Sequence, residues 1–397
     1  MMQEVLLSSI CDLKNGFAFK SKDYVDSSNT LSCRMSSIRP GGNFDLEHNQ
    51  RFLPDTYAEV YSDYLLKDGD IVIAMTDLAG DPKILGVPTI VNTGGKKLLQ
   101  NQRVGKLVIT DSSKVFIPYL QYALNRPSNK SYYKKFAGGG LQINVSKKDI
   151  LNNSVPLPPL DQQKKIAAIL DAADTYRQKT KALIEKYDEL TQSLFLDMFG
   201  DPVSNPKGWE KESLYLCLQK VEKIGKDYPG ENIEYVDIGS VDNIRNIITE
   251  TTTYKIQERP SRAQQILLSG DIIISTVRPN LKNIALNQVD GRIGSTGFFV
   301  CRAVLNKLSN LFLFKVMLTD SVTDYFVGIT SGANYPAVKS NDLKKFQVIV
   351  PPIDLQNQFG ERVQAIEVQK AQAQASLAQA EDLFNSLLQR AFKGELV

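Results

Sequence analysis

The chain has 397 residues, which is more than one typical domain core holds and enough for two domains with connecting elements. Its 42% apolar and 23% charged residues are typical of a globular protein, and no apolar run approaches the roughly 18 residues that a membrane span needs. The net charge of +3 is too small to indicate a nucleic-acid partner by itself. Because the N-terminus also lacks the pattern of a secretory signal, we expect a cytoplasmic protein.

The first region of the chain, residues 1–155, has the pattern of a mixed domain. Gly69-Asp70 is a turn signal that opens a continuously apolar, β-branched strand, "DIVIAM", which predicts burial on both faces. A further strand, "RVGKLVIT", precedes a helical pattern, "IPYLQYALN". We expect an α+β, barrel-like domain here, and we interpret Asp70 as part of a turn, not as a ligand.

Residues 156–200 predict one long helix. Asp161 follows Pro158-Pro159 as a plausible N-cap, and apolar or tolerated residues then recur in alternating steps of three and four as far as Leu194. At about 1.5 Å per residue the helix would be roughly 58 Å long. Such a helix is too long to lie inside one domain, so we expect a coiled-coil partner.

The same order then returns, with a second domain in residues 201–350 and a second helix in residues 351–397. Pro158 aligns with Pro351 at a shift of 193 residues (351 minus 158), which also pairs Phe199 with Phe392. Gly270-Asp271 opens a matching strand, "DIIIST", at a shift of 201 from Gly69-Asp70 (271 minus 70). A repeated order with loops of variable length indicates duplication.

The two helices predict an antiparallel coiled coil within one chain, with the two related domains at opposite ends about a pseudo-twofold axis. Homodimerisation through each heptad pattern is the alternative, and the duplication argues against it. The residues expected to form the seam are Ile166, Ile169, Leu183, Leu190, Val363, Ile366, Leu377 and Leu387.

No catalytic or metal-binding pattern is found in the sequence. The single histidine, His48, lies in a polar stretch, and neither a phosphate-binding loop nor a metalloprotease motif is present. The four cysteines are far apart, which predicts reduced core residues and neither a disulfide framework nor a zinc site. We therefore expect a non-catalytic protein whose two related domains sense two separated sites on one linear polymer, with DNA as the obvious candidate.

Local charge supports DNA better than net charge does. Acid-free or acid-poor stretches carry lysines that can neutralise phosphates, together with Arg, Asn and Gln side chains that can pair with base edges. The alternative interpretation of each residue is a solvated loop. The candidate DNA-binding residues are Arg103, Lys134, Lys135 and Gln142 in the first domain and Arg278, Asn280, Lys282 and Asn283 in the second.

Three stretches together carry a family resemblance: "PLPPLDQQKKIAAILDAAD" at the start of the first helix, "LFLDMFGDPVSNPKGWE" at its end, and the C-terminal "LLQRAFKGEL". With the alternation of domain and helix along the whole chain, they resemble the specificity subunit of type I restriction-modification systems. The resemblance is strongest in the helices and weak inside the domains. It implies two target recognition domains separated by conserved helices that form an antiparallel coiled coil.

The resemblance further implies a DNA-binding subunit without chemistry of its own, acting in host defence against foreign DNA. Such a subunit reads a bipartite, asymmetric site and recruits two methyltransferase subunits and two restriction subunits. S-adenosylmethionine, ATP and magnesium would be bound by those partners, and no cofactor by this chain. The Ala- and Gln-rich stretch 369–384, with the outer face of the first helix, is the expected methyltransferase docking surface.

Two other functions stay open from the sequence. One is a duplicated, non-catalytic coiled-coil adaptor whose domains bind protein or RNA. The other is an autonomous nuclease or methyltransferase, which would need a carboxylate cluster or a methyl-donor pocket that the sequence does not reveal.

Overall fold

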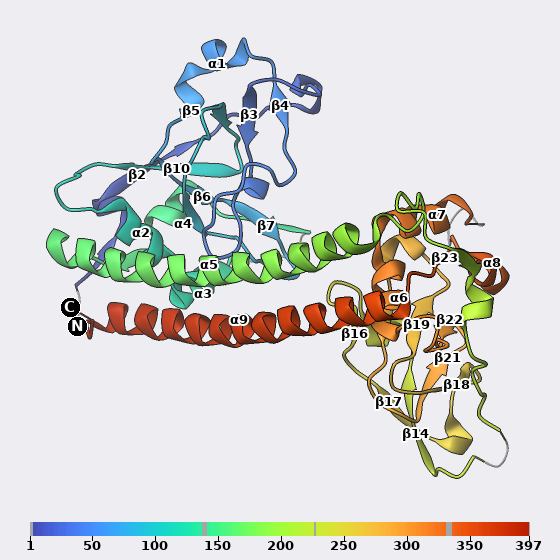
Figure 1. The fold of residues 1–397 in the computed structure, drawn as a ribbon. Helices are drawn as coiled ribbons and strands as arrows, with labels where there is room; N and C mark the ends of the chain where they lie inside the picture. Colours follow the sequence, from blue (N-terminus) through green and yellow to red (C-terminus); the bar gives the residue numbers. More distant parts are fainter. Residues whose placement is uncertain (1–2, 137–140, 226–227, 331–335, 397) are drawn as a thin grey trace. The chain divides into compact units, whose positions relative to one another are not determined.

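The computed structural model describes residues 3–136, 141–225, 228–330 and 336–396. The chain forms two compact units, of which the first comprises Met1–Thr180 with Ala375–Val397 and the second Lys181–Gln374. Each unit therefore combines one sheet-containing domain with half of each long helix (Figure 1). The division into four consecutive segments stays a prediction, because compactness groups the chain differently.

In both units most strands come first, short α-helices follow them, and a long helix comes last. The two long helices are α5 (Leu160–Phe199) and α9 (Ile353–Lys393). The first domain contains α1 (Tyr57–Val60), α2 (Ile117–Leu124), α3 (Pro127–Lys134), α4 (Lys147–Leu151), β1 (Glu4–Leu6), β2 (Cys11–Asn15), β3 (Thr30–Cys33), β4 (Phe52–Leu53), β5 (Leu65–Leu66), β6 (Ile71–Ala74), β7 (Thr76–Leu78), β8 (Pro88–Ile90), β9 (Lys97–Gln100), β10 (Val104–Ile109), β11 (Gln142–Asn144) and β12 (Ser154–Pro156). The second domain contains α6 (Asn310–Leu318), α7 (Asp320–Gly328), α8 (Ser340–Lys345), β13 (Lys211–Ser213), β14 (Asn232–Val236), β15 (Val241–Asp242), β16 (Ile247–Ile248), β17 (Thr252–Lys255), β18 (Ala263–Leu267), β19 (Ile272–Ser275), β20 (Ile284–Leu286), β21 (Arg292–Ser295), β22 (Phe298–Cys301) and β23 (Gln347–Ile349). Short 3-10 helices lie between them: η1 (Leu7–Ser9), η2 (Ser21–Asp23), η3 (Met35–Ser37), η4 (Ser62–Tyr64), η5 (Leu214–Cys217), η6 (Ile238–Ser240), η7 (Ile256–Glu258) and η8 (Pro279–Leu281).

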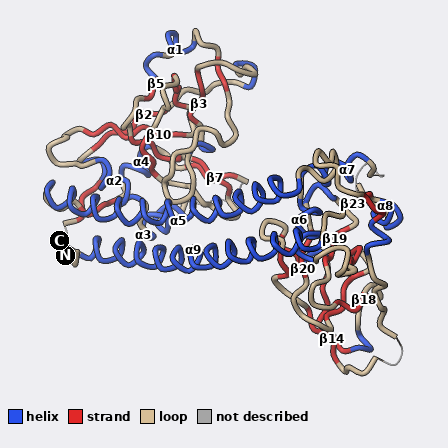
Figure 2. Tube along the Cα trace, viewed as in Figure 1, coloured by secondary structure: helices blue, strands red, loops and turns tan. Residues whose placement is uncertain are grey.

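Each domain is built around the apolar strand that the Gly-Asp turn opens. In the first domain β6 lies inside the sheet β2-β10-β6-β8, and in the second β19 lies inside β20-β19-β22. All four residues of each strand are buried, as their continuous apolar character predicts. A second sheet of four strands completes each domain, in the orders β4-β3-β9-β5 and β17-β14-β21-β18 (Figure 2). The predicted α+β fold with two sheet regions and two long helices is confirmed.

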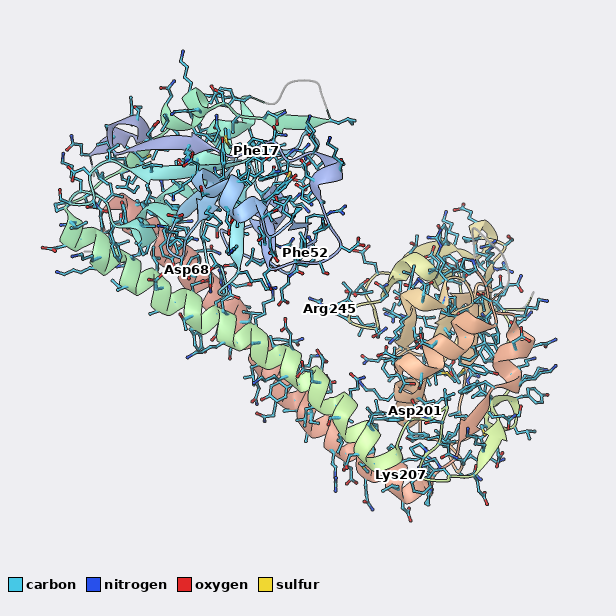
Figure 3. All side chains as sticks on the ribbon, turned by 90° about the horizontal axis from the view of Figure 1, so that it is seen from above. Phe17, Phe52, Asp68, Asp201, Lys207 and Arg245 are labelled. Carbon is cyan, nitrogen blue, oxygen red and sulfur yellow. The ribbon has the colours of Figure 1, made fainter. Side chains whose placement is uncertain are left out.

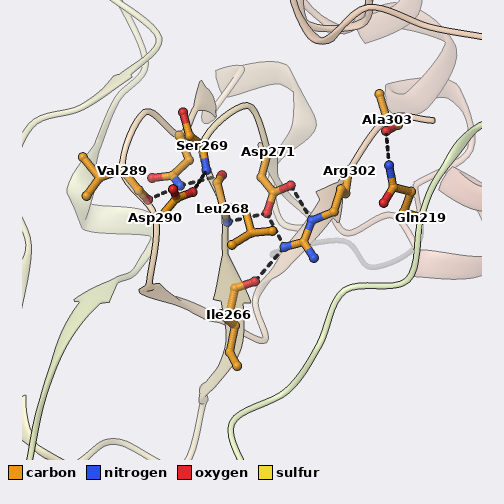
Figure 4. A network of polar contacts seen from close by, with 10 residues as sticks. Gln219, Ile266, Leu268, Ser269, Asp271, Val289, Asp290, Arg302 and Ala303 are labelled. Carbon is orange, nitrogen blue, oxygen red and sulfur yellow. Dashed lines mark hydrogen bonds and ion pairs between the residues drawn. The ribbon is translucent and has the colours of Figure 1, made fainter. Parts of the chain in front are cut away.

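The aspartate of each Gly-Asp turn pairs with a cation, which lies on the neighbouring strand β10 in the first domain and directly after the neighbouring strand β22 in the second. Asp70 accepts the backbone N–H of Lys67 at 2.8 Å and the ammonium of Lys106 at 2.6 Å. Asp271 accepts the N–H of Leu268 at 2.8 Å and two bonds from the Arg302 guanidinium, at 2.9 and 2.8 Å (Figure 4). These bonds raise the pKa of Arg302. A carboxylate satisfied in this way holds the turn and is not free to bind a ligand.

The four cysteines lie inside the domains as reduced residues. Cys11, Cys33, Cys217 and Cys301 are all buried and free. Burial raises the pKa of the Cys217 thiol to about 11. The prediction of core cysteines is confirmed. None of the described helices is both long and apolar enough to cross a membrane.

The two long helices pack antiparallel in each unit. In the first unit Ile166 and Leu170, near the start of α5, share a core cluster with Ala391, near the end of α9. In the second unit Phe199, at the end of α5, shares a cluster with Phe359, near the start of α9. Since both helices are continuous and start meets end in both units, the predicted antiparallel pairing is confirmed.

A buried glutamine joins the start of each long helix to its domain. Gln163 donates to the carbonyl oxygens of Lys114 and Pro158, both at 2.8 Å, and accepts the N–H of Phe116 at 2.9 Å. Gln356 makes the equivalent contacts in the second unit. Its partners are Lys307 O (2.9 Å), Pro351 O (2.8 Å) and Ser309 N (2.8 Å).

Aromatic pairs between a short helix and a long helix repeat in the same way. Phe312 of α6 lies with its ring centroid 4.7 Å from that of Phe199 in α5. Tyr119 of α2 lies 5.8 Å from Phe392 in α9. The predicted alignment of Phe199 with Phe392 is thus matched by equivalent contacts in the two units.

The predicted helix seam is only partly correct. Ile166 and Val363 are buried, and Ile366, Leu377 and Leu387 are half-buried. The prediction is wrong for Ile169, Leu183 and Leu190, which are 36%, 42% and 50% exposed.

At two steps of α5 the buried residue lies one position later than predicted. Leu170 is fully buried instead of Ile169, and Thr191 is buried instead of Leu190. Leu170 packs against the domain core as well as the other helix, so two neighbours and not one decide which face is buried. The Thr191 hydroxyl donates to the carbonyl of Tyr187 at 3.0 Å, which lets a polar residue occupy the seam.

We expect Gln356→Ala to lower the unfolding free energy by about 3 kcal/mol, because it leaves buried backbone groups without partners. Gln358, two residues further on, is exposed. Gln358→Ala is the control and should change stability by less than about 0.5 kcal/mol. Chemical denaturation of the full chain measures both. Equal stability of the two variants would contradict the assigned role of Gln356.

Candidate nucleic-acid interface

The candidate DNA-binding residues lie around the loops that follow the two buried strands. In the first unit Met75, directly after β6, donates its N–H to Arg103 O at 2.9 Å and accepts the N–H of Val145 at 2.9 Å. In the second unit Thr276, directly after β19, donates to Gly297 O at 3.1 Å and accepts from Val338 N at 2.9 Å. Both loops therefore leave the sheet from an equivalent backbone frame. Their sequences, "TDLAGDPKIL" and "VRPNLKN", are unrelated.

A buried carboxylate shapes the first of these loops. Asp77 accepts the backbone N–H groups of Leu78, Ile84 and Leu85 at 2.8, 2.5 and 3.0 Å. These bonds close the loop over its own carboxylate and leave Lys83 exposed on the outside. Gln142, a predicted DNA contact, is exposed on β11 opposite Leu78 of β7.

Three lysines line one cavity beside this loop. Lys83 from the loop and Lys130 and Lys134 from α3 surround it, together with Pro40, Pro82 and Leu85. All three lysines are exposed, and Lys134 is one of the DNA contacts that the sequence predicts. The cavity concentrates positive charge where a phosphate group can approach.

The other two predicted DNA contacts of the first domain are Lys135 and Arg103. The ammonium of Lys135 lies 3.8 Å from the ring centroid of Tyr132 and 5.0 Å from that of Phe136. These contacts hold Lys135 at the end of α3 while the residue stays exposed. Arg103 is half-buried in the turn between β9 and β10, and its carbonyl takes part in the frame around Met75.

In the second unit the loop of residues 277–283 contains two strained residues. Arg278 and Lys282, on either side of η8, have φ values of +52° and +49°. Among the described residues they are the only ones besides glycine and asparagine with such values. For a residue with a Cβ this region costs roughly 1–2 kcal/mol. The strained backbone places Arg278 and Asn280 on an exposed turn.

Two of the predicted contacts in this loop anchor it to the domain. The Lys282 ammonium donates to Leu318 O at 3.0 Å and to the carboxylate of Asp320 at 2.5 Å. Asn283 accepts the N–H of Ser275 at 2.9 Å through its backbone carbonyl. Both residues are half-buried. The structure thus gives Lys282 and Asn283 a positioning role, and their contact with DNA stays a prediction.

Sequence reasoning missed Lys83 and a turn at residues 243–246 that is hydrogen-bonded to the 277–283 loop. Lys83 could have been found as the cation in the loop directly after a buried strand. Asn243 and Asn246 carry no comparable signal, because their partners lie more than 35 residues away in the chain. Over the described ranges, no group of three or more His, Cys, Asp and Glu side chains is placed to hold a metal ion.

The geometry defines a duplicated binding protein with an exposed, partly cationic loop region in each unit and a long helix pair. Comparison with known proteins gives the family. A family model described as "Type I restriction modification DNA specificity domain" matches residues 1–187. Residues 1–187 thus match this family, and the chain is similar to the specificity (S) subunits of type I restriction-modification systems.

Several relatives agree with this assignment. The specificity subunit of the type I restriction enzyme EcoDI of Escherichia coli is 25% identical over 289 residues, which cover 64% of this chain and 64% of the relative. That of MjaVIII of Methanocaldococcus jannaschii is 24% identical, over 63% of each. The matches to these two relatives thus span slightly less than two thirds of their length. That of EcoBI of Escherichia coli is 22% identical, over 99% of this chain and 85% of the relative.

Solved structures show the same fold. The crystal structure of the S subunit from M. genitalium aligns with a TM-score of 0.57 at 16% identity, covering 99% of this chain and 96% of that one. A chain from a structural study of the assembly of the type I system aligns with a TM-score of 0.56, covering 99% and 98%. These structures confirm the fold that the family resemblance implies.

We expect the double variant Lys130→Ala/Lys134→Ala to weaken DNA binding by the complete complex about equally for all sequences. Each lost phosphate contact should reduce the slope of log affinity against log salt by about 0.9. Lys114→Ala, an exposed lysine paired with Asp111 outside this cavity, is the control. Fluorescence anisotropy at several salt concentrations measures the slopes. An equal loss in the Lys114 variant would contradict the assignment.

Proposed function

We propose that this chain is the DNA-reading, non-catalytic subunit of a type I complex and that each unit reads one half of a bipartite, asymmetric DNA site. One observation carries the proposal. The same backbone frame, around Met75 and Thr276, supports loops of different sequence in the two units. A common frame with different exposed side chains suits two readers of two different sequences.

The side chains around these loops suggest which residues bind phosphates, which contact bases and which anchor the loops. Lys83, Lys130 and Lys134 can neutralise phosphates, which positions the duplex without selecting a sequence. Gln142 in the first unit and Asn280 in the second can pair with adenine, and Arg278 can pair with guanine in the major groove. Lys282 and Asn283 anchor the second loop to its domain.

The helix pair would set the distance between the two half-sites. At about 1.5 Å per residue, the 40 residues of α5 give a helix of roughly 60 Å. Dimeric DNA readers fix half-site spacing through the distance between their reading elements. In a single chain the antiparallel helices can do the same.

An exposed apolar stripe on α5 suits a partner helix. Ile169, Tyr176, Leu183 and Leu190 follow one another at steps of seven residues and are 36–53% exposed. This spacing is that of a coiled-coil seam, and each of the four side chains stays at least one third exposed. We propose that the stripe, with the Ala- and Gln-rich stretch 369–384 of α9, docks the methyltransferase subunits.

The remaining parts of the proposal follow from the family. Two methyltransferase subunits would bind S-adenosylmethionine and methylate adenine, and two restriction subunits would use ATP and magnesium. The host cytoplasm, where foreign DNA must be distinguished from the cell's own, is the proposed location. The adenine to be methylated must leave the base stack, and the methyltransferase subunit would perform this step.

Mapping of methylated adenines in a strain that expresses the complete system tests the proposal. The expected result is one split motif, with two different half-sites separated by a fixed number of unspecified bases. A double variant, Arg278→Ala/Asn280→Ala, should relax only one of the two half-sites. A continuous motif, or relaxation of both half-sites, would overturn the assignment of one half-site to each unit.

The variant Leu190→Glu tests recruitment of the methyltransferase subunit separately from DNA reading. Because Leu190 is exposed, the variant should melt like the wild type but fail to co-purify with the methyltransferase subunit. Gln192→Glu, which adds the same charge at an exposed position of α5 outside the stripe, is the control and should assemble normally. Normal assembly of the Leu190 variant would show that the stripe is not the docking surface.

A further inference from the structure

A four-residue turn projects from the second unit between β15 and β16. It comprises residues 243–246, and its two central side chains, Ile244 and Arg245, are 90% and 72% exposed. Figure 3 shows the Arg245 side chain extending outward from the edge of this unit. One exposed aliphatic side chain on a protein surface is ordinary, so its exposure alone indicates nothing. The hydrogen bonds that fix the turn distinguish it from an ordinary exposed loop.

The backbone of the turn is fixed from inside. The Asp242 carboxylate accepts the N–H groups of Ile244 and Arg245, both at 2.9 Å, and these bonds lower the pKa of Asp242. Asn246 closes the turn by donating its N–H to Asp242 O at 2.7 Å. Its φ of +56° is a conformation that asparagine tolerates better than other residues with a Cβ.

Two asparagine side chains also join the turn to the strained 277–283 loop. Asn243 donates to Leu281 O at 2.8 Å. Asn246 donates to Lys282 O at 3.0 Å and to Ile284 O at 3.1 Å. The turn and the loop that presents Arg278 and Asn280 therefore form one braced surface, drawn from parts of the chain more than 35 residues apart.

The chemistry of this surface favours a base edge over a protein partner. A stable protein interface buries about 800 Å² on each side with an apolar centre, and one isoleucine among amide and cationic side chains does not provide this. An aliphatic group can contact the thymine methyl, while a guanidinium donates to guanine N7 and O6. The Asp242 carboxylate lies 4.0 Å from the Arg245 guanidinium, and such a long, partly exposed pair competes weakly for it.

We propose that Ile244 and Arg245 are specificity-determining residues that contact base edges in the half-site read by the second unit. Asn243 and Asn246 are positioning residues, since they fix the turn against the 277–283 loop. The inference rests on the proposed function and adds to it a second reading element, separate in sequence from the first.

The test uses the complete complex of this chain with its methyltransferase partner and a DNA library in which the second unit's half-site is randomised. Ile244→Ala and Arg245→Ala should each lower discrimination by roughly 10-fold at one or two adjacent base pairs of that half-site. The other half-site and the melting temperature should not change. Leu305→Ala, an exposed aliphatic residue elsewhere in the same unit, is the control and should leave the profile as it is.

The variant Asn246→Gly tests whether the asparagine bonds hold the turn against the 277–283 loop. Glycine tolerates the positive φ but lacks the amide that bonds to Lys282 and Ile284, so discrimination should fall at the positions read by both the turn and the 277–283 loop. An unchanged profile in the Ile244 and Arg245 variants, or a loss that is uniform over all positions, would overturn the inference. If the wild-type complex itself selected no split motif, the proposed function would fail instead, so the two failures are distinguishable.

Discussion

The attachment of each long helix to its own domain is the interaction on which the rest of the structure depends. A buried glutamine near the start of the helix bonds to three backbone groups of the preceding segment in both units. An aromatic pair joins the end of the other helix to the same domain, Tyr119 with Phe392 and Phe312 with Phe199. Because the glutamine at this buried junction bonds through both ends of its amide, the helix direction is fixed relative to the domain core. The loop that follows the buried strand can then be held at a defined angle to the helix.

In the two domains the buried elements are equivalent, whereas the exposed loops differ. The buried strands, the Gly-Asp turns and the frame around Met75 and Thr276 are equivalent in both units, while the loops beyond them differ in length, sequence and means of support. The first loop closes over the buried Asp77 carboxylate. The second uses two strained residues, a lysine anchor and a turn contributed by a different part of the chain. A fold organised in this way can change the sequence it reads without changing the attachment of its helices.

The sequence predicts the periodic and duplicated features well because they depend on short-range patterns. Proline pairs, Gly-Asp turns and heptads are local signals, and their repetition at shifts of 193 and 201 residues (351 minus 158 and 271 minus 70) indicates the duplication directly. The heptad could not decide which helix face is buried. The domain core draws in Leu170 in place of Ile169, and that competition is visible only in three dimensions. Composition identifies the loop containing Arg278, but it does not identify the turn at Ile244, whose bonds from Asn243 and Asn246 reach residues 36 to 38 positions away.

The central claim is that the paired helices measure the distance between two independently read half-sites. Insertion of one heptad into each helix, between Thr180 and Lys181 in α5 and between Gln374 and Ala375 in α9, tests it directly. Seven residues add about 10 Å, which corresponds to about three base pairs at about 3.4 Å each. Methylation mapping of the lengthened complex should give the same two half-sites with a spacer longer by about three base pairs. An unchanged spacer, or altered half-sites, would contradict the account.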